Sequence, residues 1–490
     1  MNKVFVNLHY LGRRNHEKLH LNNRMACKLG VPLTQILMLQ GLSACGGASS
    51  DAPDDLEPEL NTINGSPNAD YIRGTSDADI IYGMGGNDRI LAFGGDDVIN
   101  PGPGINTVFA GDGDDKIYIS TLSQNIDGGD GNDSIGFSGS LQSVKLVINF
   151  DKGTVKNSSL TSPTSVTFTN IESLLKGSNA SVEVIGSSTT RSIETGQGND
   201  FVELMGSSST VNTFEGNDNV ILYDTNVFLQ LGAGTDVVEI HNSWGNFDGG
   251  SGVDTAKFFP IEIDDFEVNL TAGTFGRGSE PENLGYLTAI ENVTVLGLNS
   301  VKLIGDGDVN ALIGGNGDDY FITNGNADIL TGNAGADTFQ FDYQANNQGV
   351  PKISDFTNNG EQDVLKFMNS EVLGQADDIL TVDTVSLSTG GIKLINANTQ
   401  VLVFLSGDGF TSNAEFQGAL NGGHGLSRTQ SQLDEFIGLW VNNTSRSTNV
   451  SQIMFAEETG TYSTSKNMIE LIDFSETNLA ALTSDNFILA

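Results

Sequence analysis

The 490-residue sequence has little cysteine, little positive charge and no long hydrophobic run. Cys27 and Cys45 are its two cysteines, and Cys27 would leave with an N-terminal presequence, so no disulfide would remain in the mature chain. Lys and Arg total 23 against 62 Asp and Glu, a net charge of −39, which argues against nucleic acid as a partner because its phosphates would be repelled. No GxSxG segment occurs, which removes the usual motif of a lipase-type hydrolase. The excess of acid instead suits divalent cations and a secreted protein.

The N-terminus has the pattern of a signal peptide. Six basic residues precede residue 29, and residues 29–42 form an uncharged, mostly apolar run that is too short to span a bilayer. The following segment, Leu-Ser-Ala-Cys at 42–45, resembles the bacterial lipobox, which implies cleavage before Cys45 and lipidation of its sulfur. Gly46 stands where an Asp would suggest retention at the inner membrane, so the resemblance favours the outer membrane. An ordinary signal peptide or an incidental Cys is the alternative, and either Met1 or Met25 is the start.

The segment HEKLH at 16–20 matches the zinc-protease signature HExxH. It lies before the apolar run of the signal, no third ligand follows at the family spacing, and translation from Met25 would remove it. We interpret the match as a coincidence and predict that the protein is not an enzyme. An enzyme remains the alternative hypothesis, with this motif as its support.

A nine-residue repeat runs from residue 64 to residue 137. Its turn positions hold, at strict intervals, Asp70, Asp79, Asp88, Asp97, Asn106, Asp115, Gln124 and Asp133. An Ile or Val follows two residues after each of them. Glycines before the turn position permit a tight turn, and the short stretch after it alternates faces as a strand does. Each unit is therefore a turn plus a short strand, and two units make one coil of a solenoid.

Residues 18 apart in such a solenoid lie about 4.8 Å apart, one strand spacing. That distance is about twice a Ca–O bond of roughly 2.4 Å, so two stacked carboxylates can share one ion while turn carbonyls complete its shell. The alternative is a solenoid that keeps each Asp as a turn former only.

The segments GGDGNDSI at 128–135, GMGGNDRI at 83–90 and AGDGDDKI at 110–117 resemble the calcium-binding RTX repeats of bacterial secreted proteins. The resemblance implies a parallel β-roll with Ca²⁺ as its cofactor.

Two further blocks repeat the pattern. In the second, Asp200, Asp218, Asp236 and Asp254 are 18 apart, while the intervening turns hold Ser209, Val227 and Gly245, so we expect calcium along one edge only. In the first block, likewise, the edge with Asp70 and Asp88 should lose calcium after Asp88, because Asn106 and Gln124 follow. In the third block, Asp319 and Asp337 form the expected site, and Asp328 is a weaker candidate with Asn310.

The breaks between blocks resemble each other: VINFDKGTV at 147–155 parallels EVNLTAGTF at 267–275, and FTNIES at 168–173 parallels LTAIEN at 287–292. We expect each break to form a hairpin beside the roll, after which the chain re-enters the solenoid. The sequence thus predicts an all-β protein, a parallel β-roll in three blocks with hairpin insertions and a mostly antiparallel C-terminal β domain. The expected parts are a signal peptide with lipobox (1–45), an acidic tether (46–63), the first roll (64–137), a hairpin insertion (138–183), the second roll (184–256), a hairpin insertion (257–302), the third roll (303–345), a roll cap (346–369) and the C-terminal domain (370–490).

The tail NLAALTSDNFILA resembles the C-termini of RTX proteins exported by type I secretion and of some surface-layer-type proteins. That route conflicts with an N-terminal lipoprotein signal, and the sequence leaves both open. We expect a calcium-binding protein of the outer membrane and cell surface, held by lipid on Cys45 and contacting a surface or matrix partner through its C-terminal domain. The alternative is a secreted enzyme or toxin-like RTX protein.

Overall fold

The computed structural model divides into two units, Met1–Glu59 and Leu60–Ala490. The residues it describes all belong to the second unit: 60–158, 165–175, 179–206, 208–223, 225–259, 265–278, 284–297, 299–324, 326–342, 349–356, 362–368, 381–386, 399–405, 412, 414, 416, 435–442, 447–456, 461–472, 482 and 487–489. The predicted signal peptide, the lipidation site Cys45, the HEKLH motif and tether residues 46–59 lie outside this set. No helix in the described part of the chain is long and apolar enough to cross a membrane.

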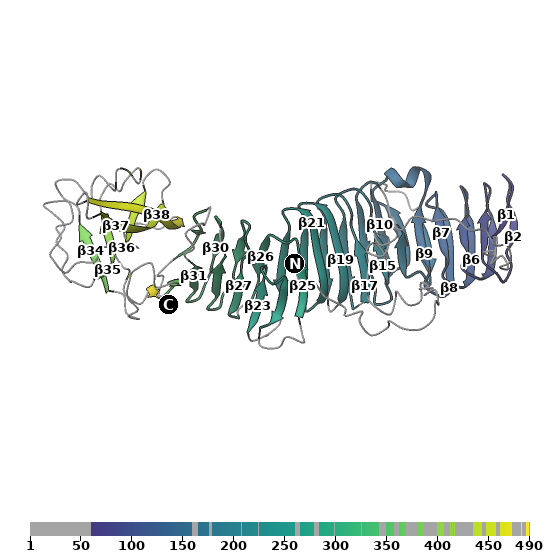
Figure 1. Cartoon of the computed structure of the whole chain (residues 1–490). Coiled ribbons are helices and arrows are strands. Elements are labelled where there is room, and N and C mark those ends of the chain that lie inside the picture. The colour runs from purple at the N-terminus through teal and green to yellow at the C-terminus, as the bar shows by residue number, and fades with distance from the viewer. Residues whose placement is uncertain are drawn as a thin grey trace, which may run out of the picture. The chain divides into compact units, whose positions relative to one another are not determined.

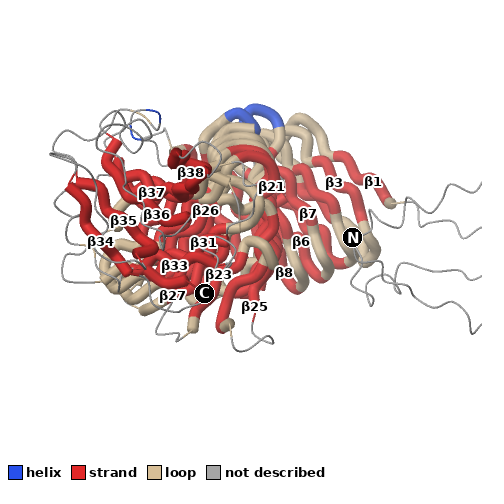
Figure 2. The backbone as a smooth tube through the Cα atoms, turned by 60° about the vertical axis from the view of Figure 1, so that its left-hand side comes forward, coloured by secondary structure: helices blue, strands red, loops and turns tan. Residues whose placement is uncertain are grey.

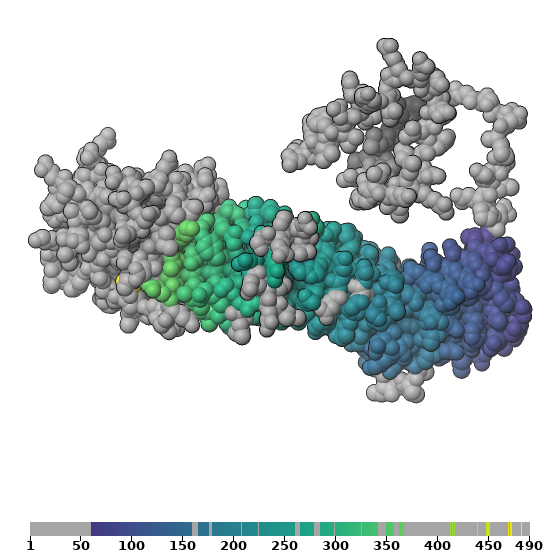
Figure 3. All heavy atoms as spheres, turned by 90° about the horizontal axis from the view of Figure 1, so that it is seen from below, coloured from purple at the N-terminus to yellow at the C-terminus, as the bar shows by residue number. Residues whose placement is uncertain are grey.

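The predicted all-β fold is confirmed: a parallel β-solenoid of about 14 coils spans residues 61–341. Figure 1 shows its strands following one another in sequence order outside the two insertions, and Figure 2 shows the short turns that join them. In Figure 3 the colours of the described residues change steadily from purple to green without mixing, so each coil contacts its neighbours in sequence. Successive strands alternate between two sheets, here called the first wall and the second wall.

In the described part of the chain, the first wall has 18 strands. In spatial order they are β1 (Asn61–Asn64), β3 (Asp79–Tyr82), β5 (Val98–Asn100), β7 (Lys116–Ile119), β9 (Ser134–Phe137), β13 (Ser173–Leu175), β15 (Ser192–Glu194), β17 (Ser208–Asn212), β19 (Asn226–Gly234), β21 (Trp244–Gly252), β25 (Leu284–Thr288), β24 (Thr274–Arg277), β23 (Phe266–Asn269), β27 (Val301–Ile304), β29 (Tyr320–Thr323), β31 (Thr338–Asp342), β33 (Val364–Met368) and β39 (Phe487–Leu489). Because β1 pairs with β3, the stack already includes residues 61–63, which the sequence places in the tether.

The second wall has 21 strands among the residues that the structure describes. In spatial order they are β2 (Tyr71–Arg73), β4 (Arg89–Gly94), β6 (Asn106–Asp112), β8 (Gln124–Asp130), β12 (Ser165–Thr169), β11 (Thr154–Asn157), β10 (Leu146–Asn149), β14 (Val182–Ile185), β16 (Phe201–Met205), β18 (Asn219–Tyr223), β20 (Val237–His241), β22 (Thr255–Phe259), β26 (Asn292–Val295), β28 (Ala311–Ile313), β30 (Ile329–Thr331), β32 (Lys352–Ile353), β38 (Thr461–Ile472), β37 (Ser447–Ala456), β36 (Glu435–Asn442), β35 (Thr399–Leu405) and β34 (Thr381–Ser386). A 3-10 helix, η2 (Gly139–Ser143), follows β9.

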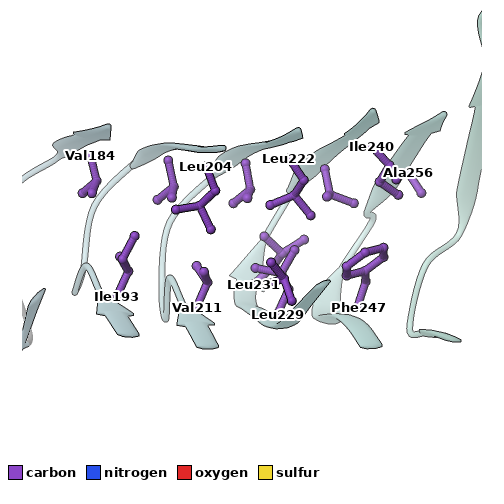
Figure 4. Packing of buried hydrophobic residues seen from close by; sticks show 14 of the residues in the cluster. Val184, Ile193, Leu204, Val211, Leu222, Leu229, Leu231, Ile240, Phe247 and Ala256 are labelled. Atoms are coloured by element: carbon purple, nitrogen blue, oxygen red, sulfur yellow. The ribbon is translucent and has the colours of Figure 1, made fainter. Parts of the chain in front are cut away.

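The core is a double column of apolar side chains, one from each strand. Ile81, Ile90 and Ile99 come from alternate walls and are fully buried, as the inward half of an alternating strand should be. Figure 4 shows the same arrangement in the second roll, where Val184 from one wall faces Ile193 from the other. The nine-residue phase thus fixes which side chain of each unit points inward.

The insertions form hairpins, but within a wall rather than beside the roll, where we expected them. In the first, β10 pairs antiparallel with β11 and β11 antiparallel with β12. The outer two strands then join the parallel stack, β12 against β8 and β10 against β14. The second wall therefore widens by two strands here, whereas in the first wall β13 follows directly on β9.

The second insertion repeats this arrangement in the opposite wall. There β25, β24 and β23 form the antiparallel group between β21 and β27. Phe275 of its middle strand packs on Phe247 and Phe258, with ring centroids 5.5 Å and 5.0 Å apart. The buried face of an antiparallel meander presents the same alternation as a roll strand, so it continues the core without a break.

The expected cap continues both walls instead of lying across the end of the roll. β32 pairs with β30 and β33 with β31, both in parallel. β38 and β39 add to the next positions, so strands of the C-terminal domain cover the open edges. Among the described C-terminal strands, β36, β37 and β38 are antiparallel as expected, while β34, β35 and β36 pair in parallel.

Candidate metal sites on the two turn edges

The turn residues form two edges, and the aspartates stack along them as carboxylate columns. The first edge holds the turns that lead into first-wall strands, and the second edge holds the turns that lead into second-wall strands. On the first edge, the backbone N–H of Asp79 donates to Oδ1 of Asp97 at 2.7 Å, that of Asp97 to Asp115 at 2.8 Å, and that of Asp115 to Asp133 at 2.9 Å. Each bond joins residues 18 apart in sequence, the spacing that the repeat predicted.

The acidic column changes edges along the chain. The second edge starts with Asp70, whose N–H donates to Asp88 at 2.9 Å. In the second roll the column lies on this edge again, and the N–H groups of Asp200, Asp218 and Asp236 donate to Asp218, Asp236 and Asp254 at 2.7 to 2.8 Å. In the third roll, Asp319 and Asp337 lie on the first edge and are bonded at 2.8 Å. Asn310 and Asp328 lie on the second edge, bonded at 2.9 Å.

The other oxygen of most of these carboxylates has no hydrogen-bond partner, although it is buried. This group of unpartnered Oδ2 atoms belongs to Asp88, Asp97, Asp115, Asp133, Asp200, Asp218, Asp236, Asp254 and Asp328. A buried, unpartnered carboxylate oxygen is costly, so a repeated set of them points to a missing positive partner.

Glycines bring the backbone of a turn close to some of these oxygens. A Cβ on Gly83 would lie 2.8 Å from Oδ2 of Asp88 and 2.4 Å from the carbonyl oxygen of Pro101 in the next coil. Both distances are too short for a Cβ, so the turn requires glycine there, and the carboxylate and the carbonyl of the neighbouring turn lie close to the same point. A hard cation that prefers oxygen ligands fits that donor set.

Burial raises the pKa of most of the stacked carboxyls. Burial, reinforced by neighbouring carboxylates, raises the pKa of Asp97 to about 6, of Asp115 to about 7 and of Asp133 to about 6, against the lowering effect of the ladder hydrogen bonds. Burial likewise raises the pKa of Asp88 and Asp254. The same cause raises the pKa of Asp200, Asp218 and Asp236 to about 6 and of Asp319, Asp328 and Asp337 to about 7.

The described residues include no group of three or more His, Cys, Asp or Glu that could hold a metal by side chains alone. A cation between two turns would therefore take one or two carboxylates and otherwise backbone carbonyls. Such a shell suits Ca²⁺, which accepts six to eight oxygens in flexible geometry.

In some turns a side-chain amide already bonds the carbonyls. Nδ2 of Asn106 donates to the carbonyl oxygens of Pro101 and Gly102 at 3.1 and 3.0 Å, and Nε2 of Gln124 donates to that of Gly102 at 3.2 Å. Nδ2 of Asn310 donates to the carbonyl oxygen of Glu291 at 3.0 Å. Each amide N–H thus bonds a carbonyl oxygen that would otherwise be available to coordinate an ion. This contact is the physical reason to expect the second edge of the first roll to lose calcium after Asp88.

In the second roll a larger side chain replaces the glycine. Thr195 and Thr213 stand five residues before Asp200 and Asp218, where every aspartate turn of the first roll has Gly or Ala. Both hydroxyls lie beside the carboxyl of their own turn, and they donate to the carbonyl oxygens of Thr213 and Leu231 in the following turns, at 3.2 and 2.7 Å. Leu231, at the same position before Asp236, is fully buried. In Figure 4 it extends the apolar column beyond Leu229. Three turns of this column are therefore filled by the chain itself.

Three aspartates are fully hydrogen-bonded by their own turns. Oδ2 of Asp70 accepts from the N–H of Ser66 at 2.6 Å, Oδ2 of Asp79 from that of Thr75 at 2.6 Å, and Oδ2 of Asp319 from that of Gly315 at 2.7 Å. These bonds resemble helix-cap bonds and hold the turn without an ion.

Three acidic residues of the columns were missed by the sequence reasoning. The N–H of Asp133 donates to Oε2 of Glu172 at 2.9 Å, that of Asp254 to Oε2 of Glu291 at 2.7 Å, and that of Asp337 to Oδ1 of Asp363 at 3.0 Å. The signal was present in the matching segments FTNIES and LTAIEN, each of which places a Glu after a buried Ile.

The fold and these turns define a parallel β-roll protein with oxygen-lined cation sites between its coils. Comparison with protein families identifies the repeats: the model of the RTX calcium-binding nonapeptide repeat matches residues 64–99, 73–108, 91–118 and 304–339. The chain thus carries RTX calcium-binding repeats, and Ca²⁺ is the ion that they bind. The matched segments lie in the first and third rolls. No curated protein matches the chain significantly.

Proposed function

We propose that the protein is a calcium-dependent component of the bacterial cell surface, in which the roll folds on calcium outside the cell and supports an adhesive or structural C-terminal domain. The observation that carries the calcium part is the set of buried, unpartnered Oδ2 atoms of Asp88, Asp97, Asp115 and Asp133, two of which, those of Asp88 and Asp133, lie near carbonyl oxygens of the neighbouring turn. Calcium would supply the positive charge that these oxygens lack.

The residues of the first roll couple this binding to folding. Without a cation, carboxylates about 5 Å apart repel one another along each edge. In the unfolded chain the same groups are dispersed, so an ion that binds the folded roll alone stabilises it by mass action. Extracellular calcium modules often have a Kd of about 10⁻⁴ to 10⁻³ M, far above the cytosolic concentration, so the chain would stay unfolded inside the cell.

The ions should be unevenly distributed. The first roll from Asp88 to Asp133 offers the most complete sites. The third roll offers a site at Asp337, with Gly332 five residues before it, whereas Thr323 stands at that position before Asp328. In the second roll, Thr195, Thr213 and Leu231 stand at the position that Gly249 holds before Asp254, so we expect the turn of Asp254 to bind an ion there. We expect Asp200, Asp218 and Asp236 to act chiefly as ladder acceptors.

The location rests on the sequence. The lipobox ending at Cys45 supports a lipid anchor at the outer membrane, and the C-terminal tail supports release by type I secretion as the alternative. Two observations support a non-enzymatic role. The acidic residues of the described turns accept the ladder bonds of the roll. The motif HEKLH precedes the predicted cleavage site.

Far-UV circular dichroism of residues 46–490 tests the calcium part. In chelator we expect little β signal, and a cooperative gain on titration to millimolar calcium but not with magnesium. A spectrum that is folded in chelator and unchanged by calcium would show that the aspartates are turn formers.

Mass spectrometry of the mature N-terminus tests the anchor. A diacylated or triacylated Cys45 would support the lipoprotein, whereas an intact N-terminus in the culture medium would support type I secretion. The adhesive role predicts calcium-dependent attachment that is lost in a deletion strain, and unchanged attachment would refute it.

A further inference from the structure

Each insertion meets the roll at a point where the ordinary turn site is rebuilt from distant parts of the chain. In a regular turn the ladder bond joins residues 18 apart. At the first insertion it joins Asp133 to Glu172, which are 39 apart, and at the second it joins Asp254 to Glu291, which are 37 apart. A glutamate thus takes the column position of the aspartate wherever an insertion intervenes.

At the first junction, the backbone of Gly128 lies close to two oxygens from different parts of the chain. A Cβ on Gly128 would lie 2.5 Å from Oδ2 of Asp133 and 1.9 Å from the carbonyl oxygen of Asn170, so both oxygens lie near the same point. Asp133 is fully buried, and this Oδ2 has no hydrogen-bond partner. Asn170 has a left-handed backbone with φ of 51°, and its side chain donates from Nδ2 to Asp127 at 2.8 Å.

The second junction has the same arrangement on the other edge. A Cβ on Gly249 would lie 2.7 Å from Oδ2 of Asp254 and 2.1 Å from the carbonyl oxygen of Ala289, whose φ is 50°. Asp254 is fully buried, and its Oδ2 is again without a partner. Burial and the neighbouring Asp254 raise the pKa of Glu291. Two copies of one constellation, in opposite walls, argue against an accident of one loop.

We propose that these two junctions are calcium sites, formed by Asp133, Glu172 and the carbonyl of Asn170 in one case and by Asp254, Glu291 and the carbonyl of Ala289 in the other. The proposal rests on the calcium binding proposed above and adds sites outside the nine-residue phase. Each ion would tie the last turn before an insertion to the first turn after it, so that calcium fastens the antiparallel meander into the wall. In chelator, the strands next to the junction would be the first to open.

The test compares the wild-type protein with Glu172→Gln and Glu291→Gln. Glutamine keeps an oxygen that can accept the ladder bond but removes the charge that the ion needs. Glu183→Gln is the matched control, because it makes the same charge change in β14, next to the first insertion. Equilibrium dialysis against calcium counts the ions, and hydrogen exchange with and without calcium reports where the ions protect the chain.

We expect Glu172→Gln and Glu291→Gln each to bind one calcium ion fewer, while Glu183→Gln binds as many as wild type. In Glu172→Gln, calcium should no longer slow exchange in β12 and β13, yet it should still slow exchange at residues 89–118, which shows that the variant folds. Calcium protection of β12 and β13 that survives Glu172→Gln would overturn the junction site alone. Absence of calcium protection anywhere in wild type would instead overturn the proposed calcium binding itself.

Discussion

Without calcium, the turns of the first edge should be more stable at acidic pH than at alkaline pH. The folded pKa values of Asp97, Asp115 and Asp133 lie at about 6, 7 and 6, above the ordinary 3.8 that applies to the unfolded chain. The folded state therefore binds more protons, and the free energy of unfolding falls as pH rises. The contribution is fully present below about pH 3.8 and is lost as pH rises through 6 to 7. This sign is opposite to that of a salt-bridged aspartate.

The magnitude follows from the shift of one group. Each pKa unit corresponds to about 1.4 kcal/mol, so raising the pH from 5 to 8 removes about 3 kcal/mol through Asp115 and about 1 kcal/mol each through Asp97 and Asp133. Asp115→Asn cannot titrate, and its oxygen can still accept the bond from the N–H of Asp97. The pH dependence of the variant should therefore be smaller than that of wild type by about 3 kcal/mol.

Hydrogen exchange in β5, β7 and β9, corrected for the intrinsic rates, measures the local opening free energy in chelator at pH 5 and pH 8. Asp112→Asn is the control, because Asp112 is an exposed residue of the same turn. With calcium the trend should reverse, since the ion must displace the bound protons and binds more weakly at pH 5. Chelated wild type that is more stable at pH 8 than at pH 5, or an Asp115→Asn variant with undiminished pH dependence, would refute the reasoning.

Three further variants test other parts of the structure. Gly83→Ala should weaken calcium binding and cost about 1 to 3 kcal/mol, since its Cβ would lie 2.4 Å from the carbonyl oxygen of Pro101; unchanged urea unfolding and calcium titration would contradict this. Thr213→Gly should open the space beside Asp218, so equilibrium dialysis should find one more calcium ion than in wild type; an equal count would show that the threonine does not exclude the ion. Phe275→Ala should destabilise the second insertion by about 3 to 5 kcal/mol, measured by urea unfolding in saturating calcium, and a loss below about 1 kcal/mol would mean that the aromatic cluster is not part of the core.

The stacked aspartate columns were predictable because a nine-residue repeat permits one arrangement of its turns. Once Ile81 and Ile90 must both point inward, the aspartates two residues before them must stack at every second unit, and the ladder bonds follow. The same phase places Asn106 where the second edge would carry an aspartate, which is why we expect that edge to lose calcium there. The sequence did not show that the amide itself would bond the carbonyls of Pro101 and Gly102.

The placement of the insertions was not predictable, since alternation identifies a strand but not its partner. The segment at 147–155 has the same apolar period whether it lies beside the roll or within its wall, and pairing of β10 with β14 depends on edges that only the assembled coils present. The filled turns of the second roll were not predicted, for a different reason. The pattern tracks the aspartate, whereas the available space depends on the residue five positions earlier, such as Thr213.

The junction glutamates and the widened walls have a common cause. At the first insertion the second wall gains two strands, which lengthen it by about 10 Å at one strand spacing each. In the first wall, however, β13 pairs directly with β9. The turn between them can no longer be the regular one, because the chain returns from β12 rather than from a strand 18 residues on. A side chain longer by one methylene reaches the ladder position from this displaced turn, and Glu172 and Glu291 do so in opposite walls. The column of acidic residues therefore continues across each insertion. In the turn after each insertion, a Glu takes the place of the Asp that the regular repeat would have.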